Sequence, residues 1–579
     1  MPLPTQLIFP GLLENAYRQE LQNLLACDAL ARLWAKDSSL WPAEKFQAES
    51  VKTNLGWLDL PEQLGPLLAR LAARAAMIEP AGFEDVVIVA LEDSSLAAET
   101  VLQLPTAKLG KRSFLLDTID PESVLAFDHA LHLDKALFVF ANKSGKHLET
   151  HFLLLYFLEK LRTHGVHSPA RHVVTLTEEN SYLGEIAGEY AFLDTFLDPP
   201  GIRGRYSSLI HFNFFLAALL RLNPAGLLAR TQSMRDACGP ATPPEANPAL
   251  SLSALLAAAN LQSLDRLVFF TTKTLKPVSH RIGSLVGAST CKNGRGIIPI
   301  FDSPSDGHEM FQRGCVVVSL KITGEECQEL AKRSDALRGV GVPVVDIKLN
   351  GPEELAVELF KWEIATALSC SLLSVNPFHD PDIRESRART LQVLEQVAAE
   401  HQSPAPAVRV REGELELYTE GKTRQQISTL NMTEALRTFF ALRHREGYIA
   451  LLPFLSFAEA HKELFRRIRE RLESTFGLPV LVTPGPRYLH GIGQVYKGGP
   501  TKGLFLLLTA DPVNDIVIPG ADYSFGQLQL ALALGDFESL GRRRRPVIRL
   551  HLTRGAQKGL PQLESILDKV LGDRRYLTA

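Results

Sequence analysis

The stretch ALFVFANKSGKHLETHFLLLYFLEKL, residues 136–161, decides the fold. It begins with an uninterrupted apolar run, passes through a small polar loop at 142–147, and continues as an amphipathic helix from about Leu148. An apolar run without polar alternation indicates a strand buried on both faces, and a helix that follows it is the usual crossover of a parallel sheet. The stretch therefore predicts one strand–loop–helix unit of a doubly wound α/β domain.

The same pattern recurs on both sides of this unit. Further apolar runs stand before helical patterns in DVVIVALEDSSL, in DRLVFFTTKTL and, near the C-terminus, in LFLLLTA and PVIRLHL. Apolar residues spaced three and four apart predict helices before residue 84. A Pro/Ala-rich stretch at 238–251 predicts a surface loop or a linker, and a Pro-rich stretch at 401 marks another break. We predict an α/β fold with four parts: a helical N-terminal segment at 1–83, doubly wound parallel-sheet domains at 84–237 and 252–390, and an α/β C-terminal segment at 400–579.

Composition narrows the class of protein. The 579 residues carry a net charge of −3, which gives no electrostatic reason to expect a nucleic acid or an anionic membrane as partner. The six cysteines are scattered without metal-ligand spacing, so we expect no metal site and a reducing, cytoplasmic setting. The N-terminus does not have the pattern of a signal peptide, and the apolar stretch at 212–220 is too short for a membrane span.

Two polar loops follow predicted strands of the first domain and precede helices. They read LEDSSL at 91–96 and NKSGKHLET at 142–150. Ligands of doubly wound sheets sit beyond the carboxyl ends of the strands, where helix N-termini favour anions. The loops are therefore candidates for a phosphate site. Ser and Thr before a helix are also ordinary N-caps, and that reading stays open.

Seven motifs carry a resemblance to a known family. Five occur in order as VIVALEDSSLAAE, FVFANKSGKHLET, LDPPGIRGRYSSL, LVGASTCKNGRGIIP and NPFHDPDIRESR, followed by GPRYLHGIGQVYKGGPTKGLFLLLTAD and IPGADYSFGQLQLALALGD. Together they resemble glucose-6-phosphate isomerase, which is built from two sugar-isomerase (SIS) domains, and the last two resemble the isomerase half of bacterial transaldolase/glucose-6-phosphate isomerase fusions. The resemblance implies two SIS domains, an aldose–ketose isomerase of glycolysis and gluconeogenesis, a sugar-phosphate substrate, no cofactor and a homodimer.

The resemblance also assigns a phosphate and sugar site. It comprises Ser94, Ser95, Asn142, Lys143, Ser144, Lys146, His147 and Glu149. The first loop departs from the family, because Glu92 and Asp93 stand where the family has two glycines. The second departs because Lys146 and His147 replace two threonines. Either Lys146 supplies charge in place of the lost hydroxyls, or it is a solvated surface charge.

The largest departure lies at the general base. In LVGASTCKNGRG the position of the catalytic glutamate is Ala288, whose methyl group cannot accept a proton. The resemblance implies that Arg205 stabilises the enediolate and that His308 aids ring opening, although a structural arginine and an exposed histidine remain open alternatives. Arg387 stands where the family has an active-site lysine. His490 matches the fusion-type C-terminal motif, and no step of the reaction is assigned to it.

Three functions follow as hypotheses. The first is a glucose 6-phosphate/fructose 6-phosphate isomerase with weakened activity. The second is a sugar-phosphate-binding protein that has lost turnover and acts as a sensor or as a partner of a true isomerase. The third is a scaffold without a ligand.

Overall fold

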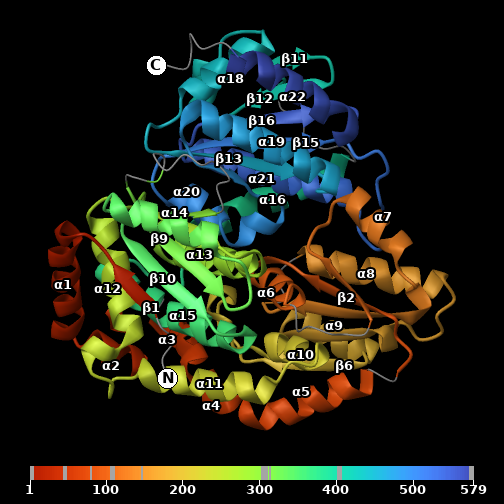
Figure 1. The fold of residues 1–579 in the computed structure, drawn as a ribbon. Coiled ribbons are helices and arrows are strands. Elements are labelled where there is room, and N and C mark those ends of the chain that lie inside the picture. The colour runs from red at the N-terminus through yellow and green to blue at the C-terminus, as the bar shows by residue number, and fades with distance from the viewer. Residues whose placement is uncertain are drawn as a thin grey trace. The chain divides into compact units, whose positions relative to one another are not determined.

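The computed structural model describes residues 5–42, 48–78, 81–104, 111–144, 148–301, 311, 314–400 and 407–572. The chain divides into two compact units (Figure 1). The first comprises Met1–Asp117, Leu131–Asp302 and Phe311–His379, and the second contains Thr118–Ala130 and Asp380–Ala579. His308 lies outside the described residues, as do Lys146 and His147.

The first unit contains the sheet predicted from residues 136–161. Its five strands are all parallel and run in the order β3-β2-β4-β5-β6. Their bounds are Arg112–Leu116 for β3, Asp85–Ala90 for β2, Ala136–Asn142 for β4, Val173–Glu178 for β5 and Asp194–Asp198 for β6. Every residue of β2 and β4 is buried, as the unbroken apolar runs predicted. The strand order reverses between β2 and β4, which makes their carboxyl ends the topological switch point of this sheet.

A second sheet in the same unit repeats this arrangement. It runs β1-β10-β9-β7-β8, with β7 (Arg266–Thr271) and β9 (Cys315–Ile322) at the reversal. The remaining strands are β8 (Ile298–Phe301), β10 (Val344–Leu349) and β1 (Thr5–Ile8). Parallel sheets alternating with helices confirm the predicted α/β class with doubly wound sheets. The N-terminal segment is mainly helical, from α1 (Gly11–Ala26) to α5 (Gly65–Ile78), but β1 adds an antiparallel edge strand that the sequence pattern did not predict.

Five helices of the first unit position the features discussed below. They are α6 (Glu92–Leu102), α10 (His211–Leu219), α11 (Pro224–Ala237), α13 (Lys276–Thr290) and α15 (Leu355–Leu372). Almost all of α13 and α15 is buried, because both are packed on several sides. No helix within the described ranges is both long and apolar enough to cross a membrane.

The second unit contains a third sheet with the same winding. Its order is β11-β12-β16-β15-β13-β14, and the last four strands named are parallel. Those four are β16 (Val547–Leu552), β15 (Gly503–Ala510), β13 (Tyr448–Phe454) and β14 (Val480–Val482), while β11 (Val410–Glu412) and β12 (Leu415–Thr419) form an antiparallel hairpin beside β16. Helices α16 (Pro381–Glu400) and α21 (Phe525–Arg542) pack together in this unit. Helix α7 (Pro121–Ala130) also belongs to the second unit, although the segments before and after it in the chain form strands of the first sheet.

The predicted domain limits at 1–83, 84–237, 252–390 and 400–579 remain predictions. Both sheets of the first unit, together with the N-terminal helices, form one compact body. The predicted linker at 238–251 overlaps the start of α12 (Pro248–Leu261), which Asn247 caps by accepting hydrogen bonds from the backbone N–H groups of Ala249 and Leu250.

Candidate active site

The N-terminus of α6 lies at the switch point of the first sheet. The helix begins at Glu92, so Ser94 and Ser95 stand in its first turn and are not residues of a preceding loop. The first backbone N–H groups of a helix have no partner within it, and the helix dipole makes this end positive. This end of α6 therefore suits an anion such as a phosphate.

The second predicted loop starts beside it, because Ala90 pairs with Ala141 across β2 and β4. Asn142 ends β4, and Lys143 follows as a buried residue. The Lys143 ammonium donates to the Glu178 carboxylate and, at 3.2 Å, to the Pro199 carbonyl. Its charge is thus already paired at the ends of β5 and β6. The role of Lys143 in holding phosphate stays a prediction.

The structure shows what Asp93, which stands where the family has a glycine, contacts. Its carboxylate is buried and accepts a hydrogen bond from the Ser284 hydroxyl of α13 at 3.3 Å. A Cβ atom placed on Gly204 would lie 3.0 Å from the other Asp93 oxygen, so the turn before Arg205 passes close to this carboxylate. Asp93 therefore ties the start of α6 to α13 and to the turn before Arg205.

Arg205 bonds to Ser289, the residue that follows Ala288 on α13. Arg205 is buried, and its Nε donates to Ser289 Oγ at 3.2 Å while Nη2 donates to the Pro377 carbonyl at 2.6 Å. Ala288 precedes Ser289 near the end of α13 and is 1% exposed. The predicted cation therefore bonds to the residue next to the predicted base position, and the catalytic roles of both positions stay predictions. What stands at the base position is a buried methyl group.

The other predicted residues stand on other elements. Glu149 lies in the first turn of α8 (Leu148–Thr163) and is buried, Ser144 is partly exposed, and Arg387 lies on α16 in the second unit. Among the described residues, no group of three His, Cys, Asp or Glu side chains is arranged to hold a metal ion.

Glu363 is a candidate acid–base group that the sequence reasoning missed. It stands on α15, is 2% exposed, and accepts hydrogen bonds from Ser208 N at 2.9 Å and from Ser208 Oγ at 2.8 Å. Burial raises the pKa of this carboxyl to about 7, against the lowering effect of Arg281. A carboxyl poised near neutral pH within a cluster of charged groups is typical of functional sites. No motif marks it, because its partners lie 82 and 155 residues away in the chain.

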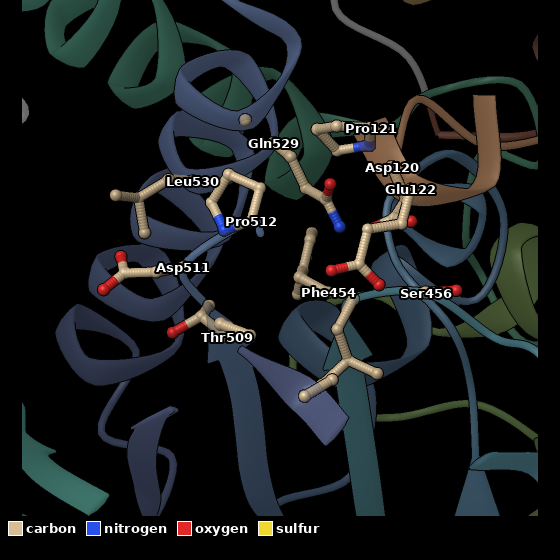
Figure 2. Close-up of a pocket in the computed structure, with 14 residues that line it drawn as sticks. Asp120, Pro121, Glu122, Phe454, Ser456, Thr509, Asp511, Pro512, Gln529 and Leu530 are labelled. Carbon is tan, nitrogen blue, oxygen red and sulfur yellow. The ribbon is translucent and has the colours of Figure 1, made fainter. Parts of the chain in front are cut away.

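The third sheet has a pocket at its own switch point. Ser456 and Asp511 follow β13 and β15 there, and Asp120 and Glu122 line the pocket on the same side as Ser456, across from Asp511 (Figure 2). Figure 2 shows the Gln529 amide pointing toward Asp120 and Glu122. The free space is about 20 Å³, enough for one water molecule. Three carboxyl groups around so small a space disfavour a sugar phosphate.

The fusion-type C-terminal motif builds a buried network instead of an open site. Lys497 and Asp536 are both completely buried and form an ion pair. The Tyr488 hydroxyl donates to Asp536 at 2.5 Å, and the Ser386 hydroxyl donates to it at 3.4 Å. This arrangement fits a structural role for the motif. His490 ends the short helix that carries Tyr488.

The chain is similar in sequence to proteins named glucose-6-phosphate isomerase. The chain is 24% identical over 389 residues to glucose-6-phosphate isomerase of Leptospira interrogans, a match that covers 59% of this chain and 87% of that protein. It is 32% identical over 155 residues to the enzyme of that name from Thermus thermophilus, covering 27% and 36%, and 29% identical over 227 residues to a probable one from Haloarcula marismortui, covering 39% and 50%.

A crystal structure of a hypothetical protein from Thermus thermophilus has the same fold over 67% of this chain and 99% of its own, with a TM-score of 0.57 and 21% identity. No protein-family model matches the chain. The specific likeness to the transaldolase fusions stays a prediction. The relatives, together with the two doubly wound sheets, support the resemblance of the chain to the glucose-6-phosphate isomerase family.

Proposed function

We propose that this protein interconverts glucose 6-phosphate and fructose 6-phosphate, with activity weakened relative to its family. The observation that carries the proposal is the clustering of the α6 N-terminus, Arg205 and the end of α13 at one edge of the first sheet. A phosphate at the helix end would leave the sugar near Arg205, whose charge stabilises the enediolate. The described residues proposed to bind the phosphate and the sugar are Ser94, Ser95, Asn142, Lys143, Ser144 and Glu149.

The weakening follows from Ala288. Removal of a general base costs about 10²- to 10⁴-fold in rate, and more where that base takes the carbon-bound proton. Residual turnover therefore requires another carboxyl. Glu363 is the described carboxyl with a pKa near neutral in this cluster, and it is the proposed substitute.

Ala288 also favours a second function, which is binding of a sugar phosphate without turnover. A buried alanine in place of the base leaves a site that holds a sugar phosphate without converting it, which suits a sensor or a partner of a true isomerase. We further propose a homodimer in the cytoplasm, on the analogy of the family alone.

The two functions are separated by proton exchange. The purified protein is incubated with fructose 6-phosphate in deuterated water, and deuterium at C2 of the glucose 6-phosphate formed is followed by NMR. Isomerisation through an enediolate incorporates deuterium, whereas binding alone raises the melting temperature without exchange. Absence of both effects would reject a sugar-phosphate ligand and leave the scaffold hypothesis.

A further inference from the structure

A cavity of about 530 Å³ lies among α6, α10, α11, α13 and α15 in the first unit (helices labelled in Figure 1). Cavities of this size hold small molecules. None of the predicted site residues that the structure describes lines it. It is therefore distinct from the predicted phosphate site, although Ser208, which lines it, donates to Glu363, the proposed substitute base.

Arg281 is the buried cationic side chain that lines the cavity. Its side chain lines the cavity and is 4% exposed, and its Nη2 atom has no hydrogen-bond partner among the described residues. A guanidinium has five N–H donors, and burying a donor without a partner is unfavourable. A buried unsatisfied donor calls for an explanation, and a ligand that accepts from it is one.

The neighbouring carboxyl groups do not complete it. Glu363 and Asp93 favour the charged form of Arg281, but Glu363 receives its hydrogen bonds from Ser208 and Asp93 receives one from Ser284. At the other end of the cavity, Arg230 is already near Glu353 and Glu354, at 3.4 and 3.6 Å. Arg281 is thus the described cation of this cavity that is deeply buried and incompletely bonded.

The rest of the wall is largely apolar. Val101 and Leu104 face the cavity from the α6 side, Leu222 and Leu227 from the α11 side, and Leu355 and Leu359 from α15. An apolar wall favours a hydrocarbon body, and one buried guanidinium favours a single anionic head. A free sugar phosphate fits poorly, because its hydroxyls would find few partners along this wall.

We infer that this cavity binds an amphipathic anion, with its carboxylate or phosphate head on Arg281 and its apolar body between α6, α11 and α15. The site does not depend on the proposed isomerase activity. It requires only that Arg281 keeps its charge and that the space between the helices stays open.

Calorimetric titration tests the inference with four probes: octanoate, octyl phosphate, octanol and inorganic phosphate. Octanoate or octyl phosphate should bind, and the better of the two identifies the head group. Octanol should bind about tenfold or more weakly, because a charge-assisted hydrogen bond contributes about 1.5–3 kcal/mol. Inorganic phosphate should not compete with the amphiphile for the cavity.

Three variants complete the experiment. Arg281→Met should weaken binding of the amphiphile about tenfold or more. Ala356→Phe fills the cavity while leaving Arg281 in place, and it should weaken binding by a similar factor. Arg338→Met, on α14 (Gln328–Gly339) and outside the cavity lining, should change nothing. Equal binding of octanol, unchanged binding by either cavity variant, absence of amphiphile binding, or displacement by fructose 6-phosphate would overturn the inference.

Discussion

The Asp93 carboxylate accepts a hydrogen bond from the Ser284 hydroxyl at 3.3 Å, across the space between α6 and α13. The contact explains how a carboxylate can occupy the first turn of a helix whose end is proposed to hold a phosphate. One of its oxygens is directed to α13, and the helix keeps a negative charge near its positive end. The charge nevertheless stays close enough to oppose a dianion.

Asp93→Asn should therefore lower the Kd for fructose 6-phosphate. The amide retains an oxygen to accept from Ser284, and the loss of one like charge contributes on the order of 1 kcal/mol, which is about fivefold in Kd. Calorimetric titration measures the change. Asp335→Asn, an exposed aspartate on α14, serves as control, and neutral fructose should show no gain. A weaker sugar phosphate complex of Asp93→Asn would mean that Asp93 positions the ligand.

Ala288→Glu should raise turnover, because it returns a carboxylate to the base position beside Ser289 and Arg205. We expect a gain of about 10²-fold in kcat, the lower range for a general base. Ala288→Gln has the same size without basicity and should give no gain. If Ala288→Glu lowers an activity that is already high, the assignment of position 288 is wrong.

The parts of the fold that follow from local pattern could be predicted. The strands β2 and β4 are unbroken apolar runs because they are buried on both faces, and their order places the loops at 91–96 and 142–150 at one edge of the sheet. The edge strand β1 could not be predicted in this way. Its four residues gain their strand conformation from pairing with β10, more than 330 residues away.

The candidate site was predictable only where a motif marks it. Arg205 stands in a recognisable motif, whereas Glu363 acquires its raised pKa from burial and from contacts that only folding creates. Arg281 is likewise one arginine among many in the sequence. Its distinction is that a buried guanidinium with one unpartnered nitrogen lies on the wall of a cavity, which is a property of the packed structure.

Glu363→Gln should alter the dependence of stability on pH. The folded pKa of Glu363 is raised from 4.5 to about 7, so between these values the folded state binds more protons than the unfolded state. The stability contributed by this residue in the wild type therefore falls as pH rises from about 4.5 to 7. The neutral glutamine does not have this penalty, and its advantage over the wild type should grow to about 3 kcal/mol above pH 7.

Urea denaturation at pH 5 and pH 8 measures this difference. Glu329 is exposed on α14, and the difference in unfolding free energy between Glu329→Gln and the wild type should not grow with pH. An advantage of Glu363→Gln that is equal at both pH values would show that Glu363 keeps its charge throughout this range. Loss of deuterium exchange in the same variant, with fructose 6-phosphate affinity unchanged, is expected if Glu363 moves the proton.

Lys497→Met should destabilise the protein strongly. The substitution leaves Asp536 completely buried with only the hydroxyls of Tyr488 and Ser386 as partners, and breaking a buried ion pair from one side costs about 3–5 kcal/mol. The double variant Lys497→Met/Asp536→Asn removes both charges and should recover most of the loss, since the cost comes from the unpaired charge. Chemical denaturation of the two variants gives the comparison. If Lys497→Met retains full stability but loses turnover, the network acts in the chemistry of the site, and the structural interpretation of the C-terminal motif is wrong.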